Sequence, residues 1–159
     1  MPGRPPIAGD KRPHQVPSRV ITICDTGPLL AYLNRNDPHH EWAVAQMKQV
    51  RAPMLVCEAV LTEVVYFLRE DGLMVDPLFQ LLEREAIRLA LDLSAQWPRI
   101  RTLMSRYRQM DLADASVVVM TELHARSRVL TIDRTDFSVY RRNDRQVIDF
   151  VSPEKPRAR

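Results

Sequence analysis

Short apolar runs rich in β-branched residues alternate with segments of helical periodicity, and this alternation constrains the fold more than any other feature of the chain. Strands are predicted at 20–25, 54–57, 87–93, 128–133 and 145–151. Because helical segments separate these strands, neighbouring strands are expected to run parallel, with helices covering both faces of the sheet. The pattern therefore predicts an α/β fold.

Helices are predicted wherever apolar residues recur every three or four positions. They start near Pro28 and at Asp37 or Pro38, and further helices cover 58–69, 77–85, 94–109 and 111–125. In the helix at 94–109, an apolar stripe is expected to pack against the protein; its members are Trp97, Ile100, Leu103, Met104 and Tyr107.

Length and composition indicate one globular domain with two tails. The chain has 159 residues, 45% of them hydrophobic, which suits a single core over residues 20–151. Proline-rich basic tails are expected at 1–19 and 152–159. Cys24 and Cys57 each end an apolar strand and are expected to be buried thiols. With neither a signal-like segment nor an apolar run of about 20 residues, the chain is expected to be cytoplasmic and not membrane-bound.

Acidic residues stand where apolar segments meet helices. Asp25 and Asp133 close predicted strands, at the edge where parallel sheets bind ligands. Glu63 lies inside the apolar run 59–68, and Asp114 precedes a fully apolar turn. Buried carboxylates repel one another unless a cation compensates their charge, so the set indicates a divalent-cation site. Helix capping by Asp25, a turn at Asp133 and an arginine partner for Glu63 are the structural alternatives.

Four segments occur in the order ICDTGPLLAYLNRND, AVLTEVVYFL, MDLADASVVVMTE and LTIDRTDFSVYR. Together they resemble the PIN-domain nucleases, most closely the VapC-type toxins. The resemblance spans roughly Val20 to Phe150. It implies a three-layer α/β/α fold with a parallel sheet of about five strands. It also implies a catalytic and metal-binding set for Mg²⁺ or Mn²⁺, with accessory positions beside it. The set is Asp25, Glu63, Asp114 and Asp133, and the accessory residues are Thr26, Asp111 and Asp136.

The same resemblance implies a metal-dependent endoribonuclease acting on tRNA, rRNA or mRNA, the toxin of a VapBC-type pair. A VapB-like antitoxin would be its partner, and a homodimer its assembly. The proline-rich N-terminal tail departs from the family pattern, in which the chain begins almost at the first strand.

Candidate RNA contacts are less specific. Residues 94–110 contain no acid but carry Arg99, Arg101, Arg106 and Arg108, which form either a phosphate-binding surface or a solvated helix face. Arg134 stands beside Asp133 and is the better-placed candidate. His39, His40 and His124 show no metal-ligand spacing.

Two other functional classes share parts of this pattern. A catalytically silent PIN-fold RNA-binding module would share the fold without cutting, although the acidic set is complete. A receiver-like phospho-acceptor domain also places aspartates at strand ends but needs a lysine near the later strands. The chain has no lysine between Lys48 and Lys155, so this class is disfavoured.

Overall fold

Five parallel strands form the centre of the structure, a computed structural model that describes residues 19–154. Their order in the sheet is β3-β2-β1-β4-β7. The strands are β1 (Ile21–Cys24), β2 (Met54–Val56), β3 (Ile87–Leu89), β4 (Ser127–Leu130) and β7 (Phe150–Val151). Every pairing is parallel. The predicted α/β fold with a five-stranded parallel sheet is confirmed.

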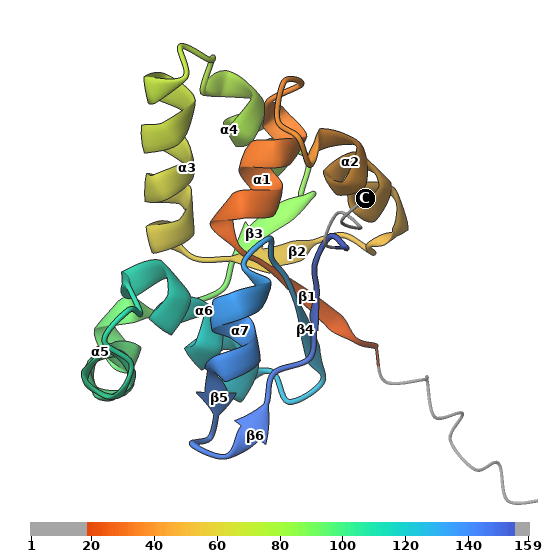
Figure 1. Cartoon of the computed structure of the whole chain (residues 1–159). Coiled ribbons are helices and arrows are strands. Elements are labelled where there is room, and N and C mark those ends of the chain that lie inside the picture. The colour runs from red at the N-terminus through yellow and green to blue at the C-terminus, as the bar shows by residue number, and fades with distance from the viewer. Residues whose placement is uncertain (1–18, 155–159) are drawn as a thin grey trace, which may run out of the picture.

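Seven helices flank this sheet in the described part of the chain. They are α1 (Thr26–Leu33), α2 (His40–Gln49), α3 (Glu58–Glu70), α4 (Asp76–Glu83), α5 (Leu93–Arg106), α6 (Leu112–Leu123) and α7 (Arg134–Val139). In Figure 1, α1 to α4 occupy the upper half of the molecule and α5 to α7 the lower half. The arrangement is the three-layer α/β/α architecture that the sequence predicted.

Helix α6 is the most buried helix because it contacts α5, α3 and the strands β1 and β4. Its eight buried residues are Ala113 and the unbroken run from Ala115 to Thr121. A helix that is apolar on all sides is one that packs on all sides. The sequence SVVVM thus follows from the position of α6 between the sheet and α5.

The predicted strand at 145–151 is two separate strands. Gln146–Val147 forms β6, which pairs antiparallel with β5 (Arg141–Arg142), and only Phe150–Val151 joins the main sheet as β7. The turn between β5 and β6 places Asn143 and Asp144 at positive φ, a conformation that Asn and Asp adopt more readily than other side chains.

Two further boundaries differ from the prediction. Strand β3 stops at Leu89, and α5 begins at Leu93 because the Asp92 side chain accepts hydrogen bonds from the Ser94 and Ala95 N–H groups. Trp97, predicted on the buried stripe of this helix, is 54% exposed, whereas Ile100 and Leu103 of the same stripe are buried.

Other expectations concern the cysteines, the tails and the membrane. Cys24 and Cys57 are free and buried, as predicted. Of the predicted tails at 1–19 and 152–159, only residues 19 and 152–154 lie within the described part of the chain. Across residues 19–154, no helix combines the length and apolar character that crossing a bilayer requires.

Candidate active site

The acidic residues lie at the carboxyl edge of the sheet, where β1 and β4 end side by side. Asp25 directly follows β1, and its backbone N–H donates to the Leu130 carbonyl at 3.0 Å. Asp133 follows β4 by three residues. From β1 the chain proceeds outward through β2 and β3, then returns to place β4 and β7 on the other side of β1. This edge is therefore the topological switch point, where open parallel sheets bind their ligands.

Asp25 is only 7% exposed, and both of its carboxylate oxygens accept hydrogen bonds. Oδ1 accepts from the Thr26 N–H at 2.8 Å, and Oδ2 accepts from the Thr131 hydroxyl at 2.7 Å. Helix α1 begins at Thr26, before the start predicted near Pro28, so Asp25 is its N-cap as well as part of the acidic site. The Thr131 hydroxyl also accepts from the Asp133 N–H at 3.0 Å, which connects two of the acids.

Glu63 reaches the site from α3, which packs against α1. Its Oε2 accepts a hydrogen bond from the Thr26 hydroxyl at 2.6 Å. The side chain is half-buried and has no arginine, lysine or histidine partner within residues 19–154. The alternative of a structural salt bridge is therefore not what this part of the chain shows.

The start of α6 contributes two more carboxylates. Asp111 is the N-cap, and its Oδ1 accepts from the Asp114 N–H at 2.8 Å, which is the capping role expected from the sequence. Asp114 is half-buried, and its Oδ2 accepts from the Tyr140 hydroxyl at 2.7 Å. Asp111 therefore orients the first turn that carries Asp114.

The third helix start at this edge is that of α7. Asp133 is its N-cap, and Oδ1 of Asp133 accepts from the Asp136 N–H at 2.9 Å. The sequence pattern indicates a turn as the structural alternative at Asp133 and does not predict this helix. Asp133 is exposed and Asp136 is half-buried, so the site grades from a buried end at Asp25 to an open end at Asp133.

The acids of the site lie close enough for their charges to raise one another's pKa values. The pKa of Asp25 is raised to about 6, chiefly by burial; the hydrogen bonds from Thr131 and Thr26 oppose the rise, and the charges of Glu63 and Asp111 add to it. Burial likewise raises the pKa of Asp114 to about 7, with contributions from Asp111, Asp25 and Asp136.

Two other acids of the group respond in the same direction. The pKa of Glu63 is raised by burial and by Asp111, and the Thr26 hydrogen bond opposes that rise. The pKa of Asp136 is raised by burial and then by Asp133. Groups with elevated pKa values gathered in one place are a frequent mark of a functional site.

The donor set suits a hard divalent cation. Within the described residues, none of these six carboxylates forms an ion pair with a basic side chain. Nor do three acidic, histidine or cysteine side chains of this part of the chain already stand close enough together to enclose an ion directly. Mg²⁺ usually retains several waters and uses only one or two carboxylates directly, so a looser group of oxygen ligands fits its chemistry.

A hollow of about 460 Å³ opens beside Asp25 and Asp133. Besides the two acids, its polar lining comes from Arg134, His39, Thr135 and Glu154, and Ile132 and Gly27 contribute to its wall. A Cβ atom on Gly27 would lie 3.2 Å from Ile132, so α1 approaches the β4–α7 loop closely at this point. Arg134, the best-placed candidate for a phosphate contact, thus borders the acidic group.

The other candidate RNA-binding arginines divide into two kinds. Arg99 donates to both oxygens of Glu122, at 3.0 and 2.8 Å, and with Arg106 it also contacts Asp144. Arg101 and Arg108 are exposed. Arg99 has a structural contact that accounts for it, whereas Arg101 and Arg108 remain the candidates on this surface.

The structure brings two residues into the site that sequence reasoning missed, Thr131 and Tyr140. Thr131 could have been found, because Thr131 and Asp133 stand two positions apart at a strand end and so point to the same side. Tyr140 carries no such signal, since its spacing from Phe137 indicates only a packed core.

The candidate histidines also have other surroundings. The His40 ring contacts the Ala31 carbonyl oxygen at 2.7 Å, His39 borders the hollow, and His124 is the C-cap of α6.

The family model described as PIN domain matches residues 22–143, and that range contains every acid of the site. A search of curated proteins finds no significant match.

Proposed function

Because this chain belongs to the PIN domain family, which has a nuclease-type fold, we propose that it is a Mg²⁺- or Mn²⁺-dependent endoribonuclease. Asp25, Glu63, Asp114 and Asp133 would hold the ion, directly or through water. The finer proposal, that it acts as the toxin of a VapBC-type pair with a VapB-like antitoxin and as a homodimer, rests on the sequence resemblance.

One observation carries the proposal. Asp25, Glu63 and Asp114 come from three different segments, and each has a pKa raised by burial and by other carboxylates of the group. Repulsion of this kind destabilises the protein unless the site binds a cation. A structural role alone gives no reason to gather the charges.

A bound divalent ion supplies two things to phosphodiester hydrolysis, a lower pKa for an attacking water and charge stabilisation for the leaving oxygen. The chain itself fixes its ligands. Thr131 and the Thr26 N–H hold the Asp25 carboxylate, and the Thr26 hydroxyl occupies Oε2 of Glu63. Oε1 of Glu63 is then the oxygen that would orient the attacking water.

The substrate backbone would approach from the open end of the site. Arg134 borders the hollow beside Asp133, and it offers a guanidinium for a phosphate next to the scissile bond. Arg101 and Arg108 would contact more distant phosphates. Products with a 5′-phosphate and a 3′-hydroxyl are expected, because a water attacks and the 2′-hydroxyl takes no part.

The test uses protein stripped with EDTA and then incubated with total RNA, with and without Mn²⁺. Wild type should cut RNA only with Mn²⁺, and Asp25→Asn should not cut under either condition. Asp149→Asn is the matched control, because Asp149 is an exposed carboxylate paired with Arg128 outside the site.

Sequencing the RNA ends identifies the cleavage position and the end chemistry. Cleavage by Asp25→Asn at the wild-type rate, or cleavage by wild type that survives EDTA, would contradict the proposal. RNA that binds the wild type but stays intact with Mn²⁺ would favour the silent binding module.

A further inference from the structure

Tyr140 is a fully buried residue at the C-cap of α7, yet its hydroxyl reaches the acidic site. The hydroxyl donates to Oδ2 of Asp114 at 2.7 Å. Among the described residues, no hydrogen bond is made to Oδ1 of the same carboxylate. One oxygen of Asp114 is thus engaged and the other is available.

The Tyr140 ring is held firmly by its neighbours. Tyr107 and Phe137 pack edge-on against it, with ring centroids 5.2 and 5.5 Å away. The Tyr107 hydroxyl in turn accepts a hydrogen bond, at 3.2 Å, from the backbone N–H of Arg141, the residue that directly follows Tyr140. Edge-to-face aromatic contacts of this kind fix ring orientation as well as position.

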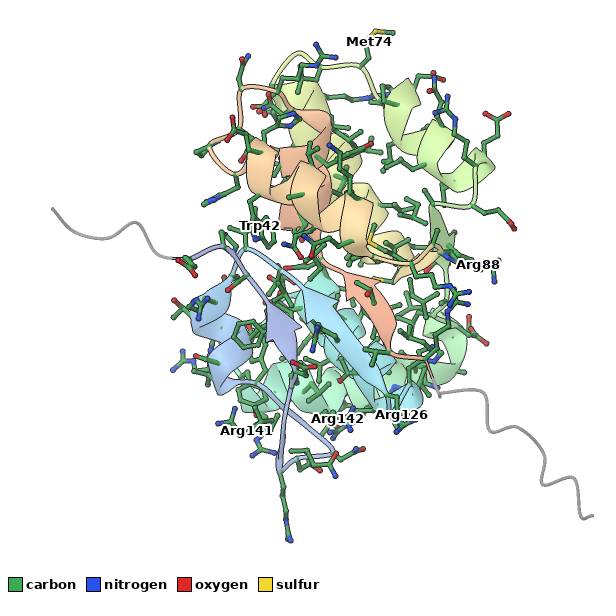
Figure 2. All side chains as sticks on the ribbon, turned by 90° about the vertical axis from the view of Figure 1, so that its right-hand side faces the viewer. Trp42, Met74, Arg88, Arg126, Arg141 and Arg142 are labelled. Atoms are coloured by element: carbon green, nitrogen blue, oxygen red, sulfur yellow. The ribbon has the colours of Figure 1, made fainter. Side chains whose placement is uncertain are left out.

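The backbone that carries Tyr140 is also clamped. One guanidinium nitrogen of Arg141 donates to the carbonyls of Ser138, Val139 and Tyr140 at 2.8 to 2.9 Å. Arg142 donates to carbonyls in the last turn and just beyond the end of α6. Figure 2 shows both arginines at the end of the molecule opposite Met74. Because these contacts hold the backbone, the Tyr140 hydroxyl has little freedom to move away from Asp114.

A buried tyrosine needs a hydrogen-bond acceptor, and a carbonyl would satisfy that need without involving the site. Here the acceptor is a site carboxylate that has no basic partner within residues 19–154. Groups outside the ligand set that hydrogen-bond to metal ligands orient them and tune their affinity.

We propose that Tyr140 is a positioning residue whose hydroxyl holds Oδ2 of Asp114, so that Oδ1 is the oxygen presented to the divalent cation. This inference rests on the proposed metal-dependent function. Tyr140 touches neither the ion nor the RNA in this role, and it acts through Asp114 alone.

The test measures Mn²⁺ binding without RNA, from the paramagnetic resonance signal of free Mn²⁺. Tyr140→Phe keeps the ring and its packing and removes only the hydroxyl. It should bind Mn²⁺ about 10- to 100-fold more weakly than wild type, the range typical for loss of such a partner. Tyr32→Phe is the matched control, because it removes the hydroxyl of a half-buried tyrosine that lines a separate hollow with Met47 and Leu81, and it should bind as wild type does.

A double-mutant cycle checks that the effect passes through Asp114. Asp114→Ala removes the acceptor, so adding Tyr140→Phe to it should cause no further loss of Mn²⁺ affinity. Thermal unfolding of each variant without metal reports whether the fold is kept. Full Mn²⁺ affinity in folded Tyr140→Phe, or a further loss in the double variant, would overturn the inference.

The outcomes separate this inference from the proposed function. If wild type binds Mn²⁺ and cuts RNA while Tyr140→Phe binds equally well, only the role of Tyr140 is wrong. If wild type neither binds Mn²⁺ nor cuts RNA, both proposals fail.

Discussion

Asp25 combines a capping role with a place in the acidic site, and its two roles respond differently to substitution. Its carboxylate caps α1 through the Thr26 N–H and accepts from the buried Thr131 hydroxyl. Asparagine keeps one acceptor oxygen for the Thr26 N–H, and its amide N–H can donate to the Thr131 hydroxyl oxygen with the direction of that bond reversed, whereas alanine removes both contacts.

We therefore expect Asp25→Ala to be less stable than Asp25→Asn by about 0.5–2 kcal/mol, the usual cost of losing an N-cap. Urea denaturation at pH 7 without metal measures the difference, and both variants lack the charge, so electrostatics cancels in the comparison. Equal stability of the two variants would mean that the cap at Asp25 contributes nothing.

The raised pKa values at the site also fix a pH dependence. Asp25 and Asp114 have folded-state pKa values of about 6 and 7, against an ordinary value of 3.8. Above pH 4 these two carboxyl groups are ionised in the unfolded chain but still protonated in the folded protein. The contribution of their raised pKa values to the free energy of unfolding is therefore complete below pH 4, and it is lost as the pH rises through 6 and 7.

The thermal midpoint of the metal-free protein should consequently fall between pH 4 and pH 7. Differential scanning calorimetry measures the fall, and Asp25→Asn should reduce its size. Asp144 has a lowered pKa, from its bonds to Arg99 and Arg106, and it acts in the opposite sense only below pH 4. A midpoint that rises across pH 4 to 7 would contradict this account.

At the residue scale, the sequence was enough to choose the acidic residues that lie near each other, but it did not reveal the residues that hydrogen-bond to them. Strand ends and apolar surroundings were enough to select Asp25, Glu63 and Asp114. The hydroxyl of Tyr140 comes from a residue 26 positions away from Asp114, and nothing local to either residue indicates the contact.

At the scale of secondary-structure elements, α5, α6 and the β5–β6 hairpin are joined by one arginine. Arg99 of α5 donates to both oxygens of Glu122 on α6 and to Asp144 in the hairpin turn. Glu122 also accepts from the Asn143 N–H at 2.7 Å. Glu122 is 12% exposed at its side chain, so the pair is largely shielded from solvent.

Arg99→Met should therefore destabilise the protein by about 1.5–3 kcal/mol, the range for hydrogen bonds to charged groups. Arg101→Met, an exposed change on the same helix, should cost no more than about 0.5 kcal/mol. Chemical denaturation separates the two.

A stability loss from Arg101→Met as large as that from Arg99→Met would show that the ion pair is not what joins these elements.

RNA affinity should show the reverse order: among folded variants, Arg101→Met should weaken RNA binding more than Arg99→Met does.

Elements with a strong period were predicted well, and short elements that depend on tertiary contacts were not. Strands β1, β2 and β4 and helices α3 and α6 lie within a few residues of their predicted places. Helix α7 has only six residues, and β6 and β7 have two each. Elements of that length have too few residues for periodicity to show, and their partners lie elsewhere in the chain.

For the whole molecule, the site exists only when the fold is complete. The Thr131 bond to Asp25 spans 106 positions of sequence, and the Thr26 bond to Glu63 spans 37. A ligand that binds this site therefore binds the folded state alone, and its binding energy adds to the stability of the entire chain.

Mn²⁺ at about 100 times its dissociation constant should stabilise the protein by about 2.7 kcal/mol. For a chain of this size, that corresponds to a rise in the thermal midpoint of roughly 5–10 °C. At a fixed Mn²⁺ concentration the rise should be larger at pH 8 than at pH 5, where protons compete for Asp25 and Asp114. A midpoint insensitive to Mn²⁺ at pH 8 would contradict a metal site.

Asp25, Asp111 and Asp133 each bind the first backbone N–H groups of a helix through the same side chain that borders the site. Rotation of these three carboxylates is thus restricted while the chain folds, before any ligand arrives. A ligand that meets them loses less entropy in immobilising side chains, so more of its contact energy appears as affinity. Formation of these three helix starts therefore also gives the ligand-binding carboxylates their fixed orientation.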